Sequence, residues 1–160
     1  MTNHLHLVAV PKEEHSLGHG LRDTHTVYAM YFNSRTALAG HVWQGRFYSC
    51  PLDDAHLWAA VRYVERNPVV VGLADHAWDY AWSSARAHCG DASGNALLHL
   101  DDWRDRMPGE TWREVLESFR DDDEAAGRIY RHTNTGRPLG SDSFLSRLEV
   151  VLGRRVRPLP

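Results

Sequence analysis

The chain has 160 residues, of which 42% are hydrophobic and 24% charged, and this suits one globular domain with a core of its own. Its formal net charge of −3 argues mildly against a nucleic-acid binder, and no signal peptide or long apolar span indicates secretion or a membrane. Cys50 and Cys89 lack metal-ligand spacing and indicate reduced thiols in a cytosolic protein.

The first half of the chain predicts strands and helices in alternation. Residues 4–10 read as a short buried strand that ends at Pro11. A helix is predicted over residues 16–36, and residues 41–52 then read as a strand of mixed aromatic and polar residues.

The clearest helix covers residues 53–67. Asp53 or Asp54 can cap its start, and Pro68 discourages helix beyond Asn67. Apolar side chains at helical spacing form its buried stripe, namely Leu57, Ala60, Val61 and Val64.

The second half of the chain predicts helices only. After a short helix behind "DYAWSS", two polar helices are predicted over residues 110–121 and 122–131, and Ser141 or Ser143 starts a last helix that runs to about Leu152. Residues 101–127 carry ten acids against four arginines, whereas residues 128–160 carry seven arginines against two acids. This asymmetry favours a polyanion-binding tail, although solvated helix faces would give the same pattern.

Two histidines occupy alternate positions near the start. Residues two apart on a strand point to the same face, so His4 and His6 would present both imidazoles on one side. Such a pair can hold one divalent metal ion, but polar residues on a half-buried strand would give the same spacing.

A tyrosine lies beside the apolar stripe of the 53–67 helix. Tyr63 shares its flank with Asn67, four residues on, and with His56, seven residues back. This grouping is compatible with a metal-assisted nucleophile. A partly buried, hydrogen-bonded tyrosine is the more ordinary interpretation.

Several short motifs, in order along almost the whole chain, resemble those of one family. They are "MTNHLHLV", "YFN" at 31–33, "WQGRF" at 43–47, "YVERNPV" at 63–69, "GL" at 72–73, "DYAWSS" at 79–84 and "GRPLG" at 136–140. The segment "NHLHLV" resembles the His-hydrophobic-His signature of the HUH single-strand nucleases. Together the motifs resemble one group within them, the repeat-associated tyrosine transposases.

The resemblance implies a fold and a set of roles. The implied fold is a ferredoxin-like α+β sandwich, in which an antiparallel sheet has helices on one face. This fold would form a catalytic domain at residues 1–100, and a helical extension with a basic tail would follow at residues 101–160. His4 and His6 match the metal-binding pair for Mg²⁺ or Mn²⁺, Tyr63 the nucleophile, and Asn67 a third ligand.

Arginines are the candidate DNA contacts. Arg46, in "WQGRF", either meets a phosphate or pairs with an acid, and Arg137, Arg154 and Arg155 would follow the DNA backbone. Three further histidines lie in or just before the predicted 16–36 helix, namely His15, His19 and His25. We interpret them as solvated helix residues.

The chain departs from the family in two places. Relatives carry an arginine where this chain has Val70, so one contact is expected to be missing. Relatives also place a strand and a helix before the histidine strand, so we expect a truncated copy or a late-starting gene model with poor stability and an open sheet edge.

The resemblance therefore implies a metal-dependent transposase or nickase that forms a 5′-phosphotyrosine at single-stranded DNA hairpins, in the cytoplasm at the nucleoid, as a monomer or homodimer. A remnant that binds hairpins without cleaving them is the alternative. A third interpretation is a replication-initiation nuclease or relaxase. The single candidate tyrosine and the "GRPLG" tail disfavour it.

Overall fold

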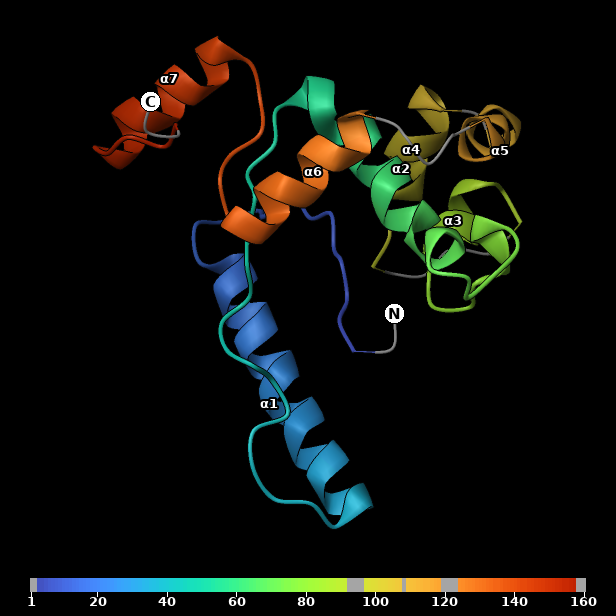
Figure 1. The fold of residues 1–160 in the computed structure, drawn as a ribbon, viewed down its shortest axis with the longest axis vertical. Helices are drawn as coiled ribbons and strands as arrows, with labels where there is room; N and C mark the ends of the chain where they lie inside the picture. The colour runs from blue at the N-terminus through green and yellow to red at the C-terminus, as the bar shows by residue number, and fades with distance from the viewer. Residues whose placement is uncertain (1–2, 92–96, 108, 119–123, 158–160) are drawn as a thin grey trace. The chain divides into compact units, whose positions relative to one another are not determined.

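The computed structural model describes residues 3–91, 97–107, 109–118 and 124–157. Within these residues it contains seven α-helices, one 3-10 helix and no β-strand (Figure 1). The elements are α1 Ser16–Thr36, α2 Asp54–Val70, η1 Ala77–Asp79, α3 Ala85–His88, α4 Leu100–Arg106, α5 Gly109–Glu117, α6 Glu124–Thr135 and α7 Asp142–Leu152.

The expectation of a ferredoxin-like sheet is wrong for the described part of the chain. Residues 4–10 and 41–50 follow irregular paths. Among the described residues, the pairing of extended backbone is limited to a single parallel bridge between Leu52 and Leu139. A strand without a partner leaves its N–H and C=O groups unpaired, so alternating hydrophobicity alone does not produce one. Leu5 and Leu7, the alternate apolar residues, are 54% and 62% exposed.

The chain divides into two compact units. The first combines Met1–Val8 with Ser49–Pro160, and the second is Ala9–Tyr48. None of the described helices combines the length and the hydropathy needed to cross a bilayer.

The Ala9–Tyr48 unit is built on α1, whose predicted bounds are confirmed. α1 ends where Ala37 takes a left-handed conformation, with φ of 53°. The chain that follows it is fastened back by Trp43, whose ring stacks on His25 at 4.0 Å and whose Nε1 donates to the His25 carbonyl at 3.1 Å.

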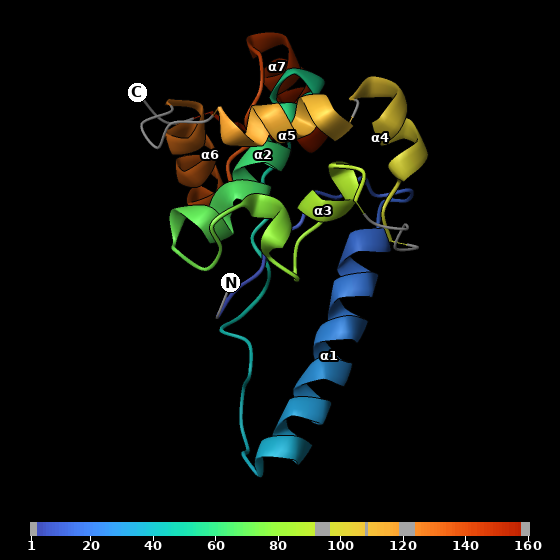
Figure 2. The ribbon, with the colours of Figure 1, turned by 90° about the vertical axis from the view of Figure 1, so that its right-hand side faces the viewer.

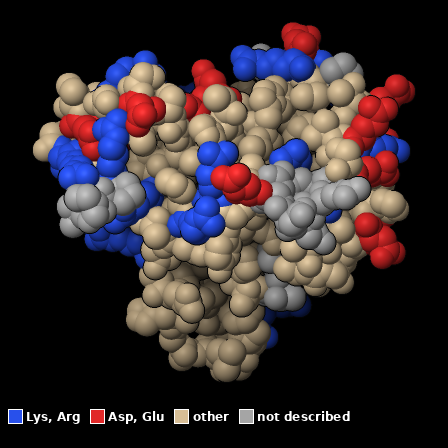
Figure 3. All heavy atoms as spheres, turned by 45° about the horizontal axis from the view of Figure 1, so that its top comes forward, with Lys and Arg blue, Asp and Glu red and all other residues tan. Residues whose placement is uncertain are grey.

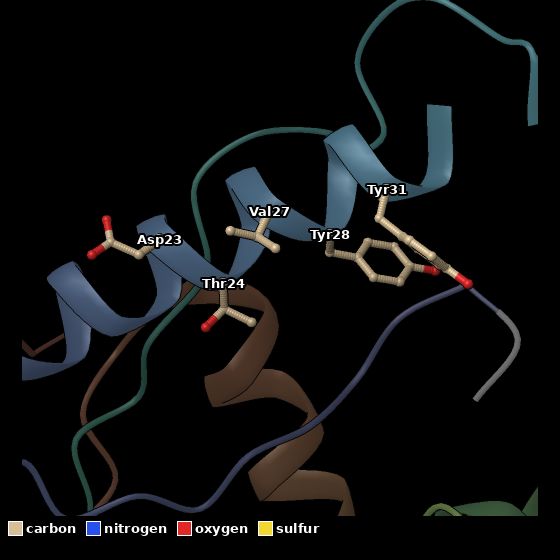
Figure 4. A pocket seen from close by; sticks show the side chains of 5 residues that line it. All are labelled: Asp23, Thr24, Val27, Tyr28 and Tyr31. Atoms are coloured by element: carbon tan, nitrogen blue, oxygen red, sulfur yellow. The ribbon is translucent and has the colours of Figure 1, made fainter. Parts of the chain in front are cut away.

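A hollow of about 560 Å³ lies along one flank of α1. Figure 4 shows the side chains that line it along successive turns of the helix. They are Asp23, Thr24, Val27, Tyr28 and Tyr31.

The other unit has α2 at its centre. Asp53 is the N-cap, because its side chain accepts a hydrogen bond from the His56 backbone N–H at 3.1 Å. η1, α5 and α6 contact α2, and α3 contacts η1 and α4 (Figures 1 and 2). The larger core cluster on this helix consists of Val61, Ala77, Ala85, Cys89, Trp112 and Leu116.

A smaller cluster joins α2 to α6 and to the turn before α7. Ala60, Ile129 and Leu139 are its buried members, and Tyr63 packs against them. The turn contains "GRPLG", and a Cβ at Gly140 would run into the Phe144 ring, which explains the need for glycine there.

The predicted end of α2 at Asn67 is wrong by one turn. Pro68 lies inside the helix and is buried, and α2 continues to Val70. Its end is closed by hydrogen bonds from the Val71 N–H to the Asn67 carbonyl and from the Leu73 N–H to the Pro68 carbonyl. Burial and this closure offset the usual helix-breaking effect of proline.

Candidate functional site

The N-terminal histidines lie beside the candidate tyrosine, within one compact unit. The His4 and His6 rings meet edge to face with centroids 5.1 Å apart, and the His6 ring meets the Tyr63 ring in the same way at 5.8 Å. His4 also hydrogen bonds Asn3 through Nδ1 at 2.7 Å. Three of the predicted site residues therefore come together although the histidines are on an irregular segment and not on a strand.

Tyr63 is half-buried on α2, and Asn67 lies one turn further along the same helix. Burial raises the pKa of the Tyr63 phenol above its ordinary value, and the nearby Tyr130 raises it further, while the Asn67 side chain lowers it. The phenol is therefore protonated at neutral pH and needs help to act as a nucleophile.

The environment of His6 favours its neutral form. Burial lowers the pKa of the His6 imidazole, and the adjacent His4 lowers it further. A neutral imidazole has a free lone pair, so His6 is suited to bind a metal ion or accept a proton at neutral pH.

His56 does not join this group. Its Nδ1 hydrogen bonds the Asp53 carboxylate, so the imidazole belongs to the cap of α2. The same carboxylate accepts from the Ser141 N–H at 2.7 Å, and the pKa of Asp53 is lowered to about 2, chiefly by its hydrogen bond to His56 and then by that to Ser141. The sequence correctly predicted an aspartate cap but not that it would engage His56.

The donor set limits which metal the site would hold. In the part of the chain that the structure describes, no three His, Cys, Asp or Glu side chains group in a way that could hold a metal ion. His4, His6 and the Asn67 amide oxygen would supply two imidazole nitrogens and one neutral oxygen. Such a set fits Mn²⁺ better than Mg²⁺, because Mg²⁺ prefers oxygen ligands and carboxylates.

The four candidate DNA-binding arginines are distributed over both units of the chain. Arg137 and Arg154 are exposed in the same unit as Tyr63, whereas Arg46 lies in the Ala9–Tyr48 unit. Arg155 is also exposed. Figure 3 shows basic side chains next to acidic ones on the face that it draws.

Another tail arginine has a structural role. Arg157 folds back onto α7, where it pairs with Glu149 and donates to the Asp142 carbonyl at 2.9 Å and to Ser146 Oγ at 3.0 Å. The predicted last helix is thereby confirmed with Ser141 as its N-cap, and part of the basic excess of the tail serves packing.

Sequence reasoning missed a buried acid on α2. Glu65 has no exposed surface, and its carboxylate accepts hydrogen bonds from Ser84, His88 and Trp112. A signal was present, because Glu65 follows Val61 by four residues and so falls on the apolar stripe.

Comparisons with known protein families, with curated proteins and with solved structures found no match to this chain.

Proposed function

We propose that the chain is a metal-dependent, single-tyrosine transposase or nickase that acts on single-stranded DNA hairpins. The observation that supports this proposal is the meeting of His4 and His6 with Tyr63, since segments more than fifty residues apart contribute the three rings. We place this activity in the cytoplasm, at the nucleoid, with a monomer or homodimer as the working form.

In the proposed reaction, the Tyr63 oxygen attacks a DNA phosphorus atom. The phosphorus–oxygen bond to the 3′ oxygen breaks, and that oxygen leaves as a 3′-hydroxyl after it takes up a proton. The 5′ phosphate stays on the tyrosine, so the bond energy is kept for rejoining and no nucleotide cofactor is needed. When bound, Mn²⁺ or Mg²⁺ would offset the negative charge that develops on the phosphate oxygens.

The other residues of the site prepare this step. Asn67, one turn along α2 from Tyr63, would hydrogen bond the phenol and so orient the oxygen that attacks. His6, kept neutral by its surroundings, would hold the metal together with His4 and the Asn67 amide. The phenolic proton passes to water, and solvent supplies the proton that the 3′ oxygen takes up. Loss of the phenolic proton is the demanding part, because burial holds the phenol in its protonated form.

A non-catalytic hairpin-binding remnant is the second candidate. It is favoured by the raised pKa of Tyr63 and by Val70, which stands where the family that the motifs resemble carries an arginine. Such a protein would bind hairpins with the same surface and leave the strand intact.

The test is a covalent-adduct assay with a hairpin oligonucleotide labelled at its 3′ end, because the 5′-phosphotyrosine fragment keeps that label. We expect a labelled protein band with Mn²⁺, and we expect Tyr63→Phe and His6→Ala to abolish it while DNA binding persists. Tyr130→Phe is the matched control, since it removes the neighbouring phenol from α6 and should leave the band.

The outcomes separate the two candidates. Binding without a band in the unaltered protein would favour the remnant. A band that persists in Tyr63→Phe would assign the nucleophile to another residue and contradict the proposal.

A further inference from the structure

The carboxylate of Glu65 is held from three directions. Its Oε1 accepts from Ser84 Oγ and is bonded to His88 Nδ1, each at 2.5 Å, and its Oε2 accepts from Trp112 Nε1 at 2.8 Å. Ser84 is the N-cap of α3, His88 is its last residue, and Trp112 belongs to α5. One side chain of α2 is therefore tied to two other helices.

The groups that hold Glu65 are themselves fixed. The His88 ring stacks on Trp103 at 3.7 Å with 14° between the planes, and Trp103 Nε1 donates to the His88 carbonyl at 3.3 Å. Trp103 meets Trp112 edge to face at 4.9 Å, and Trp112 is 1% exposed. The donors therefore form a rigid frame and do not readily follow a moving carboxylate.

Glu65 and Tyr63 are on nearly opposite sides of α2. Two residues correspond to about 200° of rotation at 3.6 residues per turn. A turn of α2 about its axis that swings Tyr63 away from His6 would also draw Glu65 from its donors. Because the carboxylate has no exposed surface, water could not replace the lost hydrogen bonds.

From this arrangement we propose that Glu65 is a positioning residue, which fixes the rotation of α2 and thereby aims the Tyr63 phenol at His6. Ser84, His88 and Trp112 supply the fixed points. The inference rests on the proposed function only in giving Tyr63 the role of nucleophile.

The rival explanation of the Glu65 contacts is that they only stabilise the unit and have no effect on Tyr63. Glu65→Gln separates the two, because an amide keeps the size of the side chain but places an NH₂ group against one of the donors. Val61→Ala is the matched control: Val61 lies on the same helix in the same core, is 8% exposed and has an apolar side chain.

The readout is the Tyr63 ring, followed by NMR in the full chain with labelled tyrosine and histidine. We expect Glu65→Gln to weaken the nuclear Overhauser contact between Tyr63 and His6 and to shift the Tyr63 pKa toward the ordinary phenol value. Val61→Ala should leave both unchanged even where it destabilises the protein. Where adduct formation is measured, Glu65→Gln should lower its rate on the order of tenfold or more at saturating hairpin.

A second variant guards against loss of folding. Trp112→Phe keeps an aromatic ring in the core but removes the donor to Oε2, so it should give a smaller change of the same sign. An unchanged Tyr63 contact and pKa in folded Glu65→Gln, or in Trp112→Phe if the former does not fold, would overturn the inference. These NMR readouts need no DNA, so they test the role of Glu65 independently of cleavage. Cleavage by Tyr63→Phe would contradict the proposed function but not the positioning role of Glu65.

Discussion

Two histidines on the two sides of α2 are held in different ways. On the Glu65 side, His88 is hydrogen bonded to a fully buried carboxylate and stacks flat on Trp103. On the Tyr63 side, His6 comes from an irregular segment and meets other rings edge to face. The same residue type therefore belongs to the hydrogen-bonded core on one side and to the proposed site on the other.

The comparison indicates which side of α2 should contribute most to stability and which side carries the proposed chemistry. The Glu65 side has rigid donors around a charge, so changes there should be felt in unfolding. The Tyr63 side has half-buried rings with shifted pKa values, so changes there should be felt in reactivity.

The largest effect is expected from Glu65→Ala. Removing the carboxylate leaves the buried Trp112 donor and the partly buried donors of Ser84 and His88 without their acceptor. It also opens a cavity, so we expect a loss of about 3–5 kcal/mol in the free energy of unfolding. His6→Ala, the counterpart on the other side of α2, should cost about 0.5 kcal/mol or less. Urea unfolding followed by tryptophan fluorescence measures both, and equal losses would remove the distinction between the two sides.

Next in size is Leu116→Ala, which tests the apolar part of the same side. Leu116 is 2% exposed in the core cluster with Trp112, so the cavity should cost about 2–4 kcal/mol in the free energy of unfolding. The Tyr63 pKa should not change, because the hydrogen bonds of Glu65 remain. A shifted Tyr63 pKa in this variant would mean that general loosening of the core, and not Glu65, controls the tyrosine.

The helices were more predictable from the sequence than the strands. The bounds of α1 and the capped start of α7 follow from local spacing and capping residues, which act within a turn or two. The strands predicted over 4–10 and 41–52 depended on a sheet partner that the described chain does not supply. Pro68 was misjudged because its burial against the core is a tertiary effect.

A third prediction concerns Asp53, which joins the start of α2 to Ser141. Asp53→Ala should cost about 1 kcal/mol in the free energy of unfolding, because it removes the N-cap. The lowered pKa of Asp53 gives stability that is complete above the ordinary carboxyl pKa and is lost as the pH falls toward about 2. In Asp53→Ala, the free energy of unfolding should lack this loss of stability at low pH. Asp53→Asn should recover part of the capping but not the pH dependence.

The smallest expected effect is the titration of His6. Because its folded-state pKa lies below the ordinary value, the unfolded chain binds more protons, so His6 destabilises the fold as the pH drops through the ordinary histidine range. His6→Asn should make the free energy of unfolding less sensitive to acid in that range. The pKa itself is read from the His6 ring resonances, and a value above the ordinary one would contradict the neutral, ligand-ready state.

The candidate site could be predicted from the sequence only in part. His4, His6, Tyr63 and Asn67 stood out by spacing and by the family resemblance, and the rings of the first three meet in the structure. Glu65 did not stand out, because a single acid on an apolar stripe has no recognisable partner until the fold brings Ser84 and Trp112 to it.

The juxtaposition of His6 and Tyr63 is the observation on which the proposed chemistry depends. The most direct measurement is a nuclear Overhauser spectrum of the full chain with labelled histidine and tyrosine rings, recorded before and after addition of Mn²⁺. We predict a cross-peak between the two rings and, with the paramagnetic ion, selective broadening of both that His4→Ala weakens. A Tyr63 ring with contacts to α6 but none to His6, and no selective broadening, would contradict a shared site.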